Sequence, residues 1–207
     1  AVYVGGEARE ERDLMEAQVV LGFPGIAYGD DDYITAQIAS SILGGGMSSR
    51  LFQEIREKRG LCYSIYAFHW GFEDAGIFGI SAATGERDAG AVVEETMNEI
   101  ARASTAVTEV EVKRAQSQLR AGLLMALESP VARAGQIARH IMFHGRTLPL
   151  DELVSRINAV TPQKVCEFLE KINVAPNPTL AAIGPIAKVP SVGAIAASAV
   201  SAKASAA

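Results

Sequence analysis

Two residues near the middle of the chain, Arg56 and Tyr63, have types and a spacing that could take part in chemistry. A run typical of a helix carries Arg56 and stops at Gly60, and a run typical of a strand carries Tyr63 and begins at once. Because a tight stop folds the strand back beside the last helical turn, a guanidinium and a phenol can converge there. The pair offers several hydrogen-bond donors, which suits a carbonyl oxygen or a developing oxyanion. The alternative is that Arg56 is a solvated helix residue and Tyr63 an ordinary strand aromatic.

The histidines and cysteines of the chain form no catalytic pattern. His140 and His144 have the i, i+4 spacing that could place two imidazoles on one side of a helix. Neither a carboxylate base nor a third ligand accompanies them, so we predict that they bind no metal. Cys62 and Cys166 are too few for a disulfide framework and are predicted to be buried thiols. We therefore expect no catalytic residue and no metal ligand in this chain.

The elements that must position Arg56 and Tyr63 follow from periodicity and from cap signals. Thr108, Ser129 and Thr161 are predicted N-caps, and three aspartates at 30–32 are expected to cap an earlier helix. The order predicts an α+β fold, with helices layered on one face of a largely antiparallel sheet. Strands are predicted at 17–23, 61–70, 77–83 and 179–183, and helices at about 30–43, 48–60, 88–100, 108–126, 129–145, 150–157 and 161–172.

Composition limits the class of protein and its partners. Hydrophobic residues make up 49% and charged residues 21%, as in an ordinary soluble globular protein. The net charge of −5, without a basic run, argues against nucleic-acid binding, and no apolar stretch is long enough to cross a bilayer. We expect one globular unit over 1–185 and an Ala/Ser-rich tail over 186–207. The start of the chain shows no signal pattern, so bacterial cytoplasm and periplasm both stay open.

A longer stretch around Arg56 and Tyr63 resembles a known family. Residues 43–67 read L-G-G-G-M-S-S-R-L-F-Q-E-I-R-E-K-R-G-L-C-Y-S-I-Y-A. This is similar to the signature of the C-terminal domain of pitrilysin/insulinase-type zinc peptidases, and most similar to bacterial proteins that resemble mitochondrial processing peptidase. The likeness extends to L-G-F-P-G at 21–25 and L-E-S-P at 127–130.

The resemblance implies a role in a larger enzyme. In that family two similar α+β halves enclose a chamber, and one half carries a His-x-x-Glu-His zinc site. The other half supplies an Arg and a Tyr that hold the substrate backbone, which Arg56 and Tyr63 match in spacing and context. The family's catalytic Glu is missing here, because Phe143 stands beside His144 in its place.

We therefore interpret the chain as the C-terminal, substrate-binding half of a zinc metalloendopeptidase. It holds an extended peptide, needs no cofactor of its own and is inactive alone, while zinc belongs to an N-terminal half on the same or a separate chain. The alternatives are a non-catalytic scaffold and a peptide-binding subunit of the same family. A homodimer is a further possible assembly.

Overall fold

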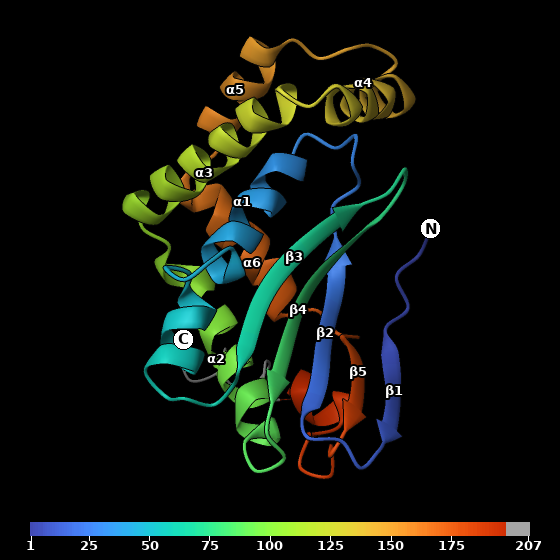
Figure 1. Ribbon diagram of the computed structural model, residues 1–207, viewed down its shortest axis with the longest axis vertical. Helices are drawn as coiled ribbons and strands as arrows, with labels where there is room; N and C mark the ends of the chain where they lie inside the picture. Colours follow the sequence, from blue (N-terminus) through green and yellow to red (C-terminus); the bar gives the residue numbers. More distant parts are fainter. Residues whose placement is uncertain (198–207) are drawn as a thin grey trace.

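The computed structural model describes residues 1–197, and 198–207 lie outside the described part of the chain. It contains a five-stranded sheet with helices gathered on one side (Figure 1). The predicted α+β class, with helices on one face of a largely antiparallel sheet, is confirmed. The elements are β1 (Gly6–Glu11), β2 (Ala17–Gly25), α1 (Tyr33–Gly44), η1 (Phe52–Glu57), β3 (Ser64–Gly71), β4 (Gly76–Thr84), α2 (Ala89–Ala106), α3 (Glu109–Leu127), α4 (Pro130–His144), α5 (Leu150–Asn158), α6 (Pro162–Asn173) and β5 (Thr179–Gly184).

The sheet has the strand order β1-β5-β2-β4-β3. β3 and β4, which correspond to the strands predicted at 61–70 and 77–83, form an antiparallel hairpin, and β2 pairs antiparallel with both β4 and β5. Phe23 and Phe78 lie opposite each other on β2 and β4 and are almost fully buried. β1 pairs with β5 in parallel, and every one of its residues is exposed. A charged, exposed edge strand resists pairing with other chains, which fits the Glu and Arg content of β1.

Most helix boundaries follow the predicted cap signals. Thr108 and Glu111 form a reciprocal capping box, and the side chains of Ser129 and Thr161 accept N–H groups of their own helices. The cap predicted at residues 30–32 is wrong in its detail, since the side chain of Asp32 makes no cap hydrogen bond to α1. The carboxylate of Asp30 instead accepts the N–H of Asp32 at 2.8 Å, so it closes a turn before the helix.

The core lies between the sheet and α1, α2 and α6. Ile38, Ile100 and Leu169, one from each helix, are fully buried, and burial of such side chains stabilises a fold by about 1.5–3 kcal/mol each. α4 differs, because His140 is its only buried residue. In Figure 1, α4 lies with α5 at the end of the molecule away from the core. Within residues 1–197, no helix is both long and apolar enough to cross a membrane.

The segment after β5 bears on the predicted division into a globular unit over 1–185 and a tail. Residues 186–195 contribute Ile186, Val189 and Ile195 to the hydrophobic core, and each is at most 5% exposed. We propose that 1–185 is the folding unit and that 186–197 covers it. Residues 198–207 of the predicted tail fall outside the described part of the chain.

This division predicts different effects for two truncations. A chain ending at residue 197 should melt at the same temperature as the full chain. A chain ending at Pro185 should still unfold in one transition, but it loses three buried side chains. The loss should cost on the order of 3 kcal/mol or more, or roughly 10 °C for a chain of this size.

Thermal unfolding followed by circular dichroism measures both truncations. Equal melting temperatures would contradict the stabilising role of 186–197. Failure of the chain ending at Pro185 to fold would contradict the division at that residue.

Candidate functional site

The segment that carries Arg56 is a π-helix rather than the ordinary helix expected over 48–60. η1 spans Phe52–Glu57, and the N–H of Lys58 donates to the carbonyl of Gln53, five residues earlier, at 3.0 Å. Leu51 and Ile55 are fully buried and fasten the segment to the core. Short π-helical turns are rare and often occur at functional sites. This register places Arg56 on the exposed side of the segment.

Gly60 ends the helical segment as predicted. Its φ of 65° is left-handed, a conformation that favours glycine. The N–H of Gly60 donates to the carbonyl of Arg56 at 3.1 Å, and the N–H of Leu61 donates to that of Ile55 at 3.0 Å. These bonds turn the chain back so that Tyr63 comes beside Arg56.

Arg56 and Tyr63 meet through the main chain of Tyr63. Arg56 Nε donates to the carbonyl oxygen of Tyr63 at 2.8 Å, and Nη1 donates to Glu57 at 2.9 Å. The guanidinium also lies over the ring of Phe52, 4.6 Å from its centroid. Tyr63 is 63% exposed, and a methyl group built on Gly85 would lie 3.7 Å from its hydroxyl. The two residues are neighbours, with the guanidinium held and the phenol open to solvent.

Arg50, which sequence analysis did not single out, anchors the segment ahead of η1. Its Nε and Nη2 donate to the two carboxylate oxygens of Glu111 at 2.6 and 3.0 Å, and its Nη1 donates to Glu99 at 3.3 Å. Nη2 also donates to the carbonyl of Ala106 at 2.6 Å. Arg50, Glu99 and Glu111 together form the Arg50 network. Its one sequence signal is Glu111, which stands three residues after the N-cap predicted at Thr108.

Hydrogen bonds and nearby opposite charges in the Arg50 network favour the ionised forms of Arg50 and Glu111. Burial alone would raise the pKa of Glu111, but hydrogen bonds from Arg50 and Thr108 outweigh it and hold the pKa at about 2. Burial would likewise lower the pKa of Arg50, yet Glu111 and Glu99 raise it. Behind η1, Arg59 pairs with Glu95 in α2 at 3.1 Å. Ion pairs therefore hold the π-helical segment on both sides of Arg56.

The histidines and cysteines do not make a metal centre within residues 1–197, where no group of three or more potential ligands is found. His69 is buried, accepts the N–H of Ile26 at 3.0 Å, and has a pKa lowered by burial to about 4. Cys62 is buried, which raises the pKa of its thiol to about 11, whereas Cys166 is partly exposed. The described residues therefore do not fit a zinc ion.

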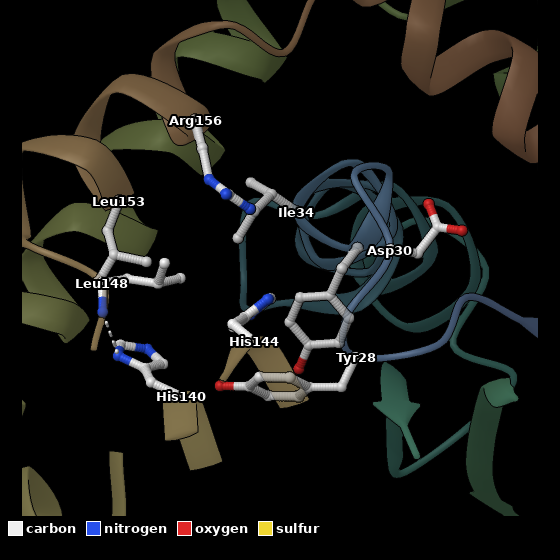
Figure 2. Close-up of a pocket in the computed structure, with 9 residues that line it drawn as sticks. Tyr28, Asp30, Ile34, His140, His144, Leu148, Leu153 and Arg156 are labelled. Atoms are coloured by element: carbon white, nitrogen blue, oxygen red, sulfur yellow. Dashed lines mark hydrogen bonds between the residues drawn. The ribbon is translucent and has the colours of Figure 1, made fainter. Parts of the chain in front are cut away.

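His140 and His144 lie close together on α4 and line a cavity that does not include Arg56 or Tyr63. Their ring centroids are 6.1 Å apart, and both line a small cavity with Tyr28 and Arg156 (Figure 2). His140 Nδ1 accepts the N–H of Leu148 at 3.3 Å. This ring nitrogen is therefore occupied by a hydrogen bond within the fold.

Comparison with known proteins identifies similar sequences. Residues 4–119 match the family described as the peptidase M16 inactive domain. An uncharacterized zinc protease of Streptomyces coelicolor is 36% identical over 176 residues, covering 84% of this chain and 38% of that protein. The beta subunit of the mitochondrial-processing peptidase of Rattus norvegicus is 29% identical over 198 residues, covering 91% of this chain and 40% of its own. This chain thus spans about two fifths of each relative.

Solved structures show the same fold. A chain in complex III2 from Candida albicans with Inz-5 bound superposes with a TM-score of 0.86, at 22% identity over 95% of this chain and 49% of that one. A conserved protein from Enterococcus faecalis superposes with a TM-score of 0.76, at 23% identity over 87% of this chain and 42% of that one. Both likenesses establish the fold alone.

The Arg50 network makes stability depend on pH. The pKa of Glu111 is about 2 in the folded chain against an ordinary 4.5. The folded chain therefore binds a proton at Glu111 less readily than the unfolded chain does. The stabilisation is complete above pH 4.5 and is lost as the pH falls toward 2. We expect Glu111→Gln to be less stable at pH 7 by about 2 kcal/mol, after allowance for solvent screening. The difference should shrink below pH 4.

Urea unfolding at pH 7, 5 and 3 measures this difference, and comparison with the variant removes the effect of other titrating groups. Glu109→Gln, at a 74% exposed carboxylate on the same helix, is the matched control and should change little. Parallel pH profiles for the wild-type chain and Glu111→Gln would contradict the assignment.

Proposed function

The chain belongs to the peptidase M16 inactive-domain family, and from this premise we propose that it is the substrate-binding, non-catalytic half of a zinc endopeptidase. Its relatives include proteins named zinc proteases and subunits of the mitochondrial-processing peptidase. The zinc, its ligands and the catalytic base belong in this proposal to an N-terminal half, on the same or another chain. The share of each relative that this chain leaves unmatched is large enough for such a half.

The observation that carries the proposal is the fixed but incompletely bonded guanidinium of Arg56. Glu57, Phe52 and the carbonyl of Tyr63 hold it in place. Its Nη2 has no hydrogen-bond partner among the described residues. Since 39% of the side chain is exposed, these N–H groups can reach a ligand oxygen. Tyr63, which is 63% exposed and lies just ahead of β3, adds a second donor through its hydroxyl.

Arg56 and Tyr63 would bind the backbone of an extended peptide. A peptide carbonyl accepts hydrogen bonds, and it accepts them more strongly when charge develops on its oxygen. A guanidinium held by three contacts loses little further freedom when it binds, so its donors are preorganised. The role of this chain in hydrolysis is therefore to place the peptide and to donate hydrogen bonds, with no proton transfer of its own.

The second candidate function is a non-catalytic scaffold. A chain of complex III2 has the same fold, so the fold also occurs within a larger assembly. A scaffold needs the surfaces of the fold but not the free donors of Arg56 and Tyr63, so the two functions differ in what these side chains do. Assembly with a second copy, and location in the bacterial cytoplasm or periplasm, stay predictions.

Tyr63→Phe tests the donor role in the enzyme reconstituted with its zinc-binding half. The change keeps the ring but removes the hydroxyl, and loss of one oxyanion donor costs on the order of a hundredfold in turnover, or about 3 kcal/mol. The melting temperature should not move, because no core cavity opens. Tyr66→Phe, at a 51% exposed tyrosine on the adjoining strand, is the matched control and should keep full turnover.

Arg56→Lys should also lower turnover, because a point charge cannot hold the carbonyl of Tyr63 and a ligand oxygen with one planar group. If Tyr63→Phe kept turnover while lowering the melting temperature, Tyr63 would be a packing residue and the scaffold function would be favoured.

The chain alone should bind no stoichiometric zinc and cleave no peptide. The reason is that no carboxylate base stands beside His140 or His144 in the sequence, and no group of three or more potential metal ligands is found among the described residues. Elemental analysis after exposure to zinc and dialysis measures the metal content, with the zinc-binding half as the positive control. About one zinc per chain, lost on His140→Ala, would overturn this expectation.

A further inference from the structure

A cleft at the end of the molecule distant from Arg56 lies among α1, α3, α4 and α5. It consists of two adjoining cavities of about 40 and 320 Å³. Tyr28, Tyr33, Ile34, His140 and Leu153 line both of them, so one ligand could extend from one cavity into the other. The larger cavity falls within the size range of small-molecule sites, which begins at roughly 300 Å³.

The larger cavity is mainly apolar. Its walls come from α1, α3, α4 and α5, and Gly122 in the middle of α3 leaves space, since no atom beyond the neighbouring residues and backbone of α3 lies within 4 Å of a methyl group built there. The aliphatic residues that line it are Ile34, Leu119, Leu123, Leu153 and Ile157. An apolar body of moderate size would be removed from water in this space.

The smaller cavity is rich in hydrogen-bond donors. His140 is only 4% exposed; because its Nδ1 accepts the N–H of Leu148, the neutral ring carries its proton on Nε2. Nε2 has no hydrogen-bond partner among the described residues. Tyr33 accepts a hydrogen bond from Gln37 at 3.0 Å, which leaves its own hydroxyl proton free to donate.

Arg156 adds a positive charge that is not fully neutralised. Figure 2 shows its side chain pointing into the cavity from α5. Arg156 donates to Glu152 at 2.9 Å, but Arg146 donates to both oxygens of the same carboxylate at 2.7 and 2.8 Å. Two guanidinium groups therefore share one carboxylate. Asp30 also lines the cavity, on the side opposite Arg156 in Figure 2, and its carboxylate accepts the N–H of Asp32.

The histidines do not add charge to this cavity. Burial lowers the pKa of His140, and the nearby charges of His144, Arg139 and Arg156 lower it further. Burial and Arg156 also lower the pKa of His144. Near neutral pH both rings are uncharged, so His140 acts as a donor through Nε2 and Arg156 as the cation.

We propose that this cleft binds an amphiphilic carboxylate, with its apolar body in the larger cavity and its carboxylate among Tyr33, His140 and Arg156. The donors and the partly neutralised guanidinium match the oxygens of a carboxylate, and the aliphatic walls match an attached hydrocarbon. Two sources share this chemistry: a free fatty-type carboxylate and the C-terminal carboxylate of an apolar peptide. The cleft shares no residue with the site around Arg56, so it would be a second, separate site.

Isothermal titration calorimetry of the 207-residue chain tests the proposal with two probes, octanoate and N-acetyl-Leu-Leu with a free carboxylate. Octanol and N-acetyl-Leu-Leu-amide are the uncharged counterparts. At least one acid should bind saturably at one site per chain. Its uncharged counterpart should bind with an affinity at least about tenfold lower, since a hydrogen-bonded charge contributes on the order of 1.5–3 kcal/mol. Whichever acid binds identifies the source.

Three variants locate the binding. Gly122→Leu fills the larger cavity and should weaken binding at least about tenfold, while the helix is kept because Leu is the better helix former. Gly135→Leu, at a glycine of α4 that does not line the cleft, is the matched control and should bind as the wild-type chain does. Arg156→Gln should abolish the preference for the acid over its uncharged counterpart.

Absence of saturable binding by both acids would overturn the proposal. So would equal affinity for an acid and its uncharged counterpart, or unchanged binding in both Gly122→Leu and Arg156→Gln. Melting temperatures of the variants separate loss of binding from loss of fold.

Discussion

The guanidinium of Arg50 joins segments that lie far apart in the sequence, and the candidate site depends on this contact. It bonds to Glu99 in α2 and to Glu111 at the start of α3. Removing Arg50 would leave the largely buried carboxylate of Glu111 with hydrogen bonds from Thr108 alone, which is more costly than breaking an exposed pair. A π-helical turn is uncommon, and the ion pairs of Arg50 before η1 and of Arg59 after it hold this one against α2 and α3. Arg56 lies between these anchors, so its position follows from theirs.

Local hydrogen bonds explain why most of the helical layout could be predicted from the sequence. A cap such as Thr108, Ser129 or Thr161 bonds within three residues of itself, so the boundary depends on neighbours that the sequence displays. The parallel pairing of β1 with β5 joins the two ends of the chain, and nothing in either segment specifies its partner. The cap expected at residues 30–32 was wrong because the carboxylate of Asp30 bonds within the preceding turn.

The part of the candidate site that depends on local structure could also be predicted from the sequence. Gly60 reverses the chain over a few residues, and this brings Arg56 to Tyr63. The sequence does not specify which atoms meet, because the contact of the guanidinium with the carbonyl depends on how η1 is anchored. The cleft lay beyond prediction. His140 and Arg156 come from different helices, and their spacing in the sequence matches no binding motif.

The two sites also differ in how firmly the fold holds them. Leu51 and Ile55 tie η1 to the core, whereas α4 contributes His140 as its only buried residue. A helix with few buried contacts opens locally at a lower free energy than a core element. A ligand that bridges α4, α5 and α1 would stabilise the closed arrangement by mass action, so occupancy of the cleft and order of α4 would be linked. The support of Arg56 comes from α2, α3 and the core. A change at α4 can therefore occur while the donors at Arg56 stay in place.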